Sequence, residues 1–89
     1  MTPRNRWTPT QIRNARQTPL KPLLEKMGYP MQALQNDNWK IYDLPIEIVI
    51  KEHYWSSSHH QTGGNAIDLL MQVIGMTFSE AMEKLEEFM

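Results

Sequence analysis

Hydrophobic positions change their spacing twice along the chain and divide it into three parts. Up to about residue 27 they recur at helical spacing, between about 31 and 57 they alternate with polar residues, and from residue 66 helical spacing returns. This pattern predicts an α+β domain. One or two short N-terminal helices precede a small antiparallel sheet, and two C-terminal helices pack on that sheet.

Two start signals predict the N-terminal helices. The Thr-Pro pair at residues 8–9 predicts a helix over 9–17, because a threonine hydroxyl caps free amides and proline fits a first turn. The second pair predicts Thr18 as a cap and Pro19 as the first helical residue of another helix. Gly28 is the expected stop.

Alternating residues in the middle of the chain predict three or four short strands. Their approximate positions are 31–35, 39–43, 46–50 and 54–57. We expect a tight turn near Lys51 and Glu52, and a corner or sheet edge at Pro45. The isoleucines at 46, 48 and 50 are expected to share one face.

The C-terminal third is predicted to form two helices. The apolar residues of the first are Ala66, Leu69, Leu70, Val73 and Ile74, and this helix is expected to end at Gly75. Thr77 and Glu80 then form a capping-box pattern at the start of the last helix.

Composition narrows the class of protein. The chain has 89 residues, of which 40% are hydrophobic and 21% charged, as expected for one small globular domain. It has no cysteine, which excludes disulfides and thiolate metal sites. Residues 1–8 are predicted to be a flexible basic arm and 9–89 a single domain. With no signal-peptide pattern and no long apolar run, we expect a cytoplasmic location and no membrane partner.

Charge is distributed unevenly between the two ends of the chain. Within residues 1–24 there are five bases and no acid, and from residue 46 onward two bases stand against seven acids. This asymmetry favours a polyanion at the basic end and a different partner at the acidic end. A simple solvated terminus is the alternative explanation for the basic residues.

One run of the sequence resembles a known family. Residues 63–85, GGNAIDLLMQVIGMTFSEAMEKL, are similar to the C-terminal half of the zinc-binding domain of bacterial replicative primases. The matching positions are Gly63, Gly64, Ala66, Ile67, Asp68, Gly75, Phe78, Glu80 and Ala81. This run is about a quarter of the chain, and a weaker similarity covers 39–85. The chain resembles even more closely the primase-zinc-finger-like modules that precede Toprim domains in plasmid and mobile-element proteins, many of which lack the cysteines.

The departures from the primase pattern concern the metal ligands. Ser57 and His60 stand where that family has its second pair of cysteines, and the first pair has no counterpart. A structural zinc site needs four good donors in a tetrahedral arrangement. The resemblance therefore implies a zinc-free domain. We expect no cofactor and no catalytic residue, because no carboxylate is spaced to orient the ring of His59 or His60.

Aromatic and basic residues in the sheet region predict a surface for single-stranded nucleic acid. The predicted binding residues are Arg4, Arg6, Arg13, Arg16, Lys21, Lys40, Tyr42, Lys51, His53, Trp55, His59 and His60. Tyr54 and Trp55 point to opposite faces of one strand, so at most one lies in the core and the other can stack a base. Burial explains any one of these aromatics equally well, and a solvated loop explains the histidines.

Gly63, Gly64 and Asn65 are a candidate phosphate nest at the start of a helix. A sharp turn from a hairpin into a helix, with Asn65 as the cap, is the alternative.

These features and the resemblance together predict a non-catalytic accessory module that binds single-stranded DNA. It would act in primer synthesis or replication of a mobile element, and would present template to a primase, polymerase or helicase subunit. The alternative is a protein-interaction subunit that stabilises a polymerase or helicase without contacting DNA.

Overall fold

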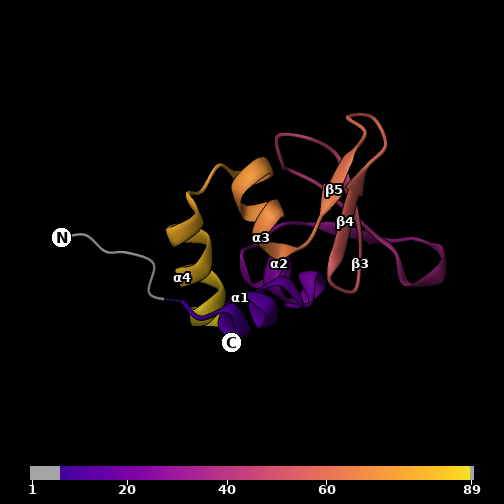
Figure 1. Ribbon diagram of the computed structural model, residues 1–89. Helices are drawn as coiled ribbons and strands as arrows, with labels where there is room; N and C mark the ends of the chain where they lie inside the picture. The colour runs from indigo at the N-terminus through magenta and orange to yellow at the C-terminus, as the bar shows by residue number, and fades with distance from the viewer. Residues whose placement is uncertain (1–6, 89) are drawn as a thin grey trace.

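Eleven short elements follow one another in the computed structural model, which describes residues 7–88 (Figure 1). In chain order they are the helices α1 (Pro9–Arg16) and α2 (Leu20–Lys26), the strand β1 (Met31–Ala33), the 3₁₀ turn η1 (Gln35–Asp37), the strands β2 (Trp39–Ile41), β3 (Ile48–Lys51), β4 (Tyr54–Ser57) and β5 (Thr62–Gly64), the helical turn α3 (Ala66–Asp68), the π-helical segment η2 (Leu69–Ile74) and the helix α4 (Phe78–Phe88). The predicted α+β class is confirmed.

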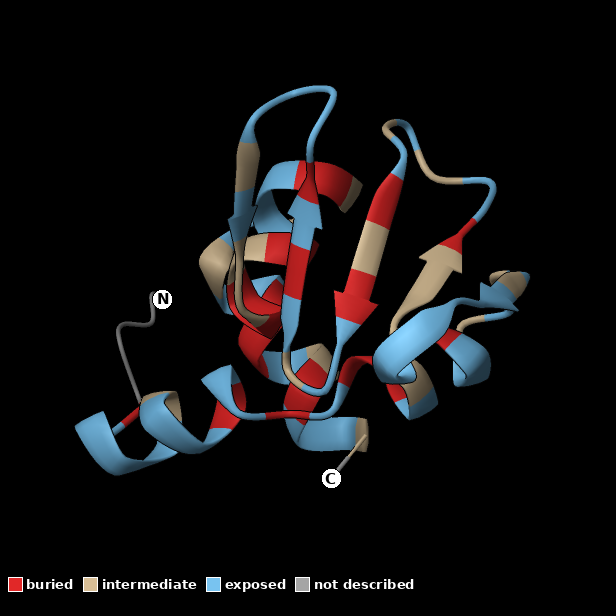
Figure 2. Cartoon of the chain, turned by 90° about the vertical axis from the view of Figure 1, so that its right-hand side faces the viewer, coloured by how far each residue is buried: buried red, intermediate tan, exposed pale blue. Residues whose placement is uncertain are grey.

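The five strands form one antiparallel sheet in the order of the sequence, β1-β2-β3-β4-β5. Three to four strands were predicted, and the additional strand is β5. The register aligns Ile50 with Trp39 on one side and with Trp55 on the other, and Trp55 with Gly64. Buried and exposed residues alternate along β3 and β4 (Figure 2), so one face of the sheet meets the core and the other meets solvent.

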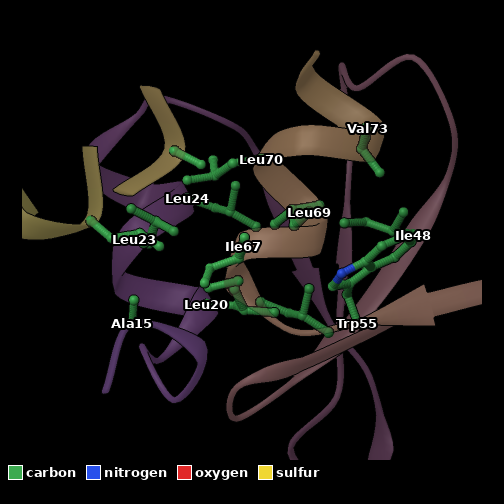
Figure 3. Packing of buried hydrophobic residues seen from close by; sticks show 14 of the residues in the cluster. Ala15, Leu20, Leu23, Leu24, Ile48, Trp55, Ile67, Leu69, Leu70 and Val73 are labelled. Carbon is green, nitrogen blue, oxygen red and sulfur yellow. The ribbon is translucent and has the colours of Figure 1, made fainter. Parts of the chain in front are cut away.

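The helices α2 and α3 contact the sheet at β3 and β5. Leucines of α2 and η2 meet Ile48 and Trp55 of the sheet in this core (Figure 3). The prediction that both C-terminal helices pack on the sheet is wrong for α4, which packs mainly against α1, α3 and η2. Its apolar face is therefore buried by helices, and the structure has a second helical layer.

Side-chain caps begin three of the helical segments at the predicted residues. Thr8 accepts from the amide of Gln11. Asn65 forms a capping box with Asp68, and Thr77 forms one with Glu80. These caps could be predicted from the sequence because each depends on two residues that are three positions apart.

The start of α2 differs from the prediction. Pro19 occupies the cap position itself, without a side-chain hydrogen bond, and Thr18 is buried before it. The amide of Leu20 instead donates to the carbonyl oxygen of Glu52 at 2.9 Å. The turn between β3 and β4 thus takes the place of a side-chain cap, and this contact holds the turn beside the N-terminal helices.

The N-terminal boundary of the domain also lies earlier than predicted. Trp7 is 8% exposed, and its ring meets that of Phe78 edge-to-face, with centroids 5.9 Å apart. A buried aromatic contributes substantially to a core of this size, so residue 7 belongs to the domain and not to a flexible arm. Arg4 and Arg6 lie outside the described residues.

Close backbone approach explains why glycine occupies position 63, and alanine there is expected to destabilise the domain. An added Cβ would lie 2.6 Å from the carbonyl oxygen of Trp55, so β4 and β5 would have to separate. We expect Gly63→Ala to lower the free energy of unfolding by about 2 kcal/mol, measured by urea denaturation. Ser56→Ala, at the exposed cross-strand partner, is the control, with an expected change within about 0.5 kcal/mol. Equal stability of the two variants would contradict this explanation.

No helix within residues 7–88 is long and apolar enough to cross a membrane.

Candidate nucleic-acid interface

A groove of about 200 Å³ lies between α1 and the turn that joins β3 to β4. Its lining residues are Arg13, Arg16, Gln17, His53, Tyr54 and Asn65. In Figures 1 and 2 this turn points toward the N-terminal helices, as the hydrogen bond between Leu20 and Glu52 requires. We call this feature the arginine groove. Three of the predicted binding residues, Arg13, Arg16 and His53, meet in it.

The two arginines reach the groove from one side of α1. Arg13 and Arg16 are three residues apart, so they lie one above the other on the helix surface. Ala15 lies on the opposite side of α1, which faces the core, and is fully buried there. The helix therefore presents two guanidinium groups to the same place, and each can donate to a phosphate in a bidentate manner.

The other wall of the groove is aromatic. The rings of His53 and Tyr54 are 4.3 Å apart at their centroids and inclined by 35°. Tyr54 is 61% exposed, which leaves ring surface open to solvent. Stacking surface thus stands beside two cations, the combination that single-stranded nucleic-acid sites use.

Trp55 is not part of this surface, and its prediction as a binding residue is wrong. It is 3% exposed and faces the core, and its indole nitrogen donates to the carbonyl oxygen of Asn65 at 2.9 Å. Tyr54, the other member of the pair, is the exposed aromatic. The alternation along β4 predicted that the two residues face opposite ways but not which one is buried.

The groove carries positive charge without a compensating acid. None of the six residues that line it within the described chain is acidic. The carboxylate of Asp68, next to Asn65 in the capping box, accepts a hydrogen bond from the Asn65 amide at 3.1 Å. The groove therefore favours an anion over a cation.

A second part of the candidate surface is the solvent-facing side of the sheet, which we call the open face. It carries alternate residues of the strands together with Tyr42, namely Gln32, Lys40, Tyr42, Val49, Lys51, Tyr54 and Ser56. Tyr42 belongs here because its hydroxyl donates to the side chain of Gln32. Tyr54 borders both the arginine groove and the open face, so the two surfaces are continuous.

Lys40 on the open face is already engaged by an acid. Its ammonium lies 2.7 Å from the carboxylate of Glu47 and 5.5 Å from the ring centroid of Tyr42. The hydrogen bond to Glu47 raises the pKa of Lys40, and the same bond lowers the pKa of Glu47. The charge of His59 also lowers the pKa of Glu47, to a smaller extent.

The remaining predicted residues are not among those that line the groove. The Lys21 ammonium lies 2.8 Å from the Glu25 carboxylate and 4.5 Å from the centroid of the Trp39 ring. His59 and His60 contact each other edge-to-face in the loop after β4, with ring centroids 5.1 Å apart. Lys21 thus has partners within the protein, whereas Lys51 remains exposed at the open face.

The geometry contradicts a phosphate nest at residues 63–65. Gly63 and Gly64 are strand residues of β5, and the amides of Ile67 and Asp68 already donate to the side chain of Asn65. The Asp68 carboxylate lies so close to Gly64 that a Cβ there would clash with it. A negative charge in that position repels a phosphate, and the alternative, a close turn into a capped helix, is correct.

The serine and histidine at the expected ligand positions contact each other in the loop after β4. Ser57 is buried, and its hydroxyl accepts a hydrogen bond from the His60 amide at 3.3 Å. Within residues 7–88, no three histidine, aspartate or glutamate side chains are grouped so that they could hold a metal ion. Comparisons of the chain with protein-family models, curated proteins and solved structures give no match.

Proposed function

We propose that this domain binds single-stranded nucleic acid, with the arginine groove as the principal contact. The observation that carries the proposal is the meeting of Arg13 and Arg16 with the stacked His53–Tyr54 pair in one groove. Two guanidinium groups suit a phosphodiester backbone, and an exposed tyrosine suits an unpaired base. A base pair inside a duplex offers no free face for such stacking, so single strands are the preferred ligand.

The domain acts without chemistry of its own and is an accessory module. We assign it to primer synthesis or replication of a mobile element, on the strength of the resemblance of residues 63–85 to primase zinc-binding domains. In this role it holds template DNA at the basic groove. The acidic helix α4, which packs against α1, then meets a primase, polymerase or helicase subunit.

Tyr54 provides the direct test of this function. We expect the protein to bind a fluorescein-labelled oligothymidylate of about 12 nucleotides in fluorescence anisotropy at low salt. Tyr54→Ala is expected to weaken binding by about tenfold, because base–aromatic stacking contributes about 1–3 kcal/mol per base. Tyr54→Phe keeps the ring and is the matched control, with affinity close to wild type. Failure of the wild-type protein to bind at low salt would overturn the proposed function.

A second function, protein interaction without DNA contact, is favoured by one observation on α4. A hollow of about 310 Å³ there combines three carboxylates, those of Glu80, Glu83 and Glu87, and one ammonium, that of Lys84, with the apolar side chains of Ile74 and Met76. Acidic groups around an apolar floor suit a basic, amphipathic segment of a polymerase or helicase. Absence of oligonucleotide binding in the anisotropy experiment would favour this second function.

A further inference from the structure

We infer that Glu47 is an internal competitor for nucleic-acid phosphate at Lys40, and that it restrains binding across the open face. The inference rests on the proposed function and adds to it a residue that sets affinity. Glu47 was not among the predicted binding residues. It matters because its carboxylate occupies the position on Lys40 that a phosphate oxygen would take.

The first step concerns where the pair lies. Lys40 aligns with Val49 in the sheet register, and Val49 aligns with Ser56, so the lysine belongs to the same open face as Tyr54. From Tyr54 to Tyr42 the face crosses two strand intervals and about four residues along the strands, a distance of about 17 Å. A bound nucleic-acid strand that leaves the arginine groove at Tyr54 therefore reaches Lys40 and Tyr42 within a few nucleotides.

The second step concerns the chemistry of the pair. The contact between Lys40 and Glu47 has the 2.7 Å length of a charge-assisted hydrogen bond, and the lowered pKa of Glu47 keeps it ionised. Their side chains are 33% and 58% exposed. An exposed pair of this kind exchanges partners at little cost, so an incoming phosphate can replace the carboxylate.

The third step concerns Tyr42. The Lys40 ammonium lies over this ring, in a hollow of about 210 Å³ that also includes Asp43, Leu44, Ile46 and Glu47. A base that stacks on the same side of the ring displaces the ammonium from both the ring and Glu47. A nucleotide supplies both a base that stacks on Tyr42 and a phosphate that replaces the Glu47 carboxylate. A bare anion supplies only the replacement for the carboxylate.

The charges around the hollow support the same conclusion. Glu47 and Asp43 both line it, and Lys40 is the single cation among its lining residues in the described chain. With Glu47 ionised the hollow carries excess negative charge and repels phosphate, and removal of that carboxylate leaves Lys40 available.

The test compares two glutamates that each pair with a lysine. We expect Glu47→Gln to bind the labelled oligothymidylate about threefold more tightly than wild type at low salt, a change within the range of one exposed ion pair. Its affinity should also fall more steeply with salt, because Lys40 adds about one phosphate contact. Glu25→Gln is the matched control, since it removes an equal charge from a 2.8 Å pair with Lys21 that lies off the proposed path. We expect less than a twofold change for this control.

A double-mutant cycle with Lys40→Gln separates the local effect from the change in net charge. The gain from Glu47→Gln is expected to disappear when Lys40 is also replaced. Equal gains for Glu47→Gln and Glu25→Gln, or a gain that persists without Lys40, would overturn the inference while wild-type binding still supports the proposed function. Absence of binding by wild type and by Glu47→Gln alike would overturn both.

Discussion

Replacement of Trp55 with alanine is expected to leave the domain largely unfolded at 25 °C. Trp55 lies in β4 between the strands β3 and β5, is 3% exposed, and pairs with Ile50 and Gly64 in these neighbouring strands. Truncation of a buried tryptophan costs about 3–5 kcal/mol, which is comparable with the whole stability of a small domain. The variant also leaves the carbonyl oxygen of Asn65 without the indole donor that it now has at 2.9 Å.

The adjacent tyrosine is the matched control for this experiment. Tyr54→Ala removes an aromatic ring from the same strand, but from the solvent-facing side, and is expected to change the free energy of unfolding by less than about 0.5 kcal/mol. Trp55→Phe keeps most of the buried area and loses only the donor, so its stability should fall between the other two. Circular dichroism during urea denaturation measures all three. Similar unfolding midpoints for Trp55→Ala and Tyr54→Ala would show that β4 faces the other way.

Tyr54 and Trp55 show which part of the structure of β4 can be predicted from the sequence. Alternation in a strand requires Tyr54 and Trp55 to face opposite sides of the sheet. Which side is buried depends on where the helices pack, and that is decided by contacts between residues far apart in the chain. The acceptor for the indole nitrogen, the carbonyl oxygen of Asn65, lies ten residues away on the other side of a loop.

The helix caps were predictable because their determinants are local. Asn65 with Asp68, and Thr77 with Glu80, each form within three residues of sequence. The cap of α2 was not predictable in the same way. The amide of Leu20, at the start of α2, donates to the carbonyl oxygen of Glu52, which is remote in the chain. The local Thr-Pro signal therefore predicted the wrong cap residue.

The strand β5 was missed because its residues have little intrinsic preference for a strand. Thr62–Gly64 contains two adjacent glycines, a pattern typical of turns. They nevertheless pair with Ser56 and Trp55 in the sheet, at positions where the carbonyl oxygen of Trp55 and the carboxylate of Asp68 leave no room for a Cβ. Packing at both positions therefore outweighs local propensity.

Most residues of the candidate site could be named from the sequence, but their assembly into one groove could not. Basic and aromatic residues in the sequence indicate nucleic-acid binding. Only the three-dimensional structure shows which of the basic residues have acidic partners. Lys21 and Lys40 have acidic partners at 2.8 and 2.7 Å, whereas Arg13 and Arg16 meet in a groove whose lining contains no acid within the described residues. Gln17 and Asn65 join that groove only through the fold.

Replacement of both groove arginines is expected to weaken binding of single-stranded DNA by about a hundredfold. Arg13 and Arg16 line one groove beside His53 and Tyr54, so a bound phosphate can accept hydrogen bonds from both guanidinium groups. Hydrogen bonds to charged groups contribute about 1.5–3 kcal/mol each, and the loss of two gives an effect of this size. We propose Arg13→Gln with Arg16→Gln, because glutamine retains helix propensity in α1. Anisotropy titrations at several salt concentrations should also show a salt dependence that is shallower by about two phosphate contacts.

The control must remove the same charge from a different place. Lys26 and Lys84 line a separate groove beside Phe88, and Lys26→Gln with Lys84→Gln reduces the net charge by the same amount. If binding depends on the arginine groove, this control retains most of the wild-type affinity, because neither Lys26 nor Lys84 is among the residues that line that groove. Equal losses in the two double variants would show that net charge governs binding, and the groove would then have no specific role. A loss confined to the arginine variant, together with the weaker binding of Tyr54→Ala, would show that the phosphate and base contacts occupy one site.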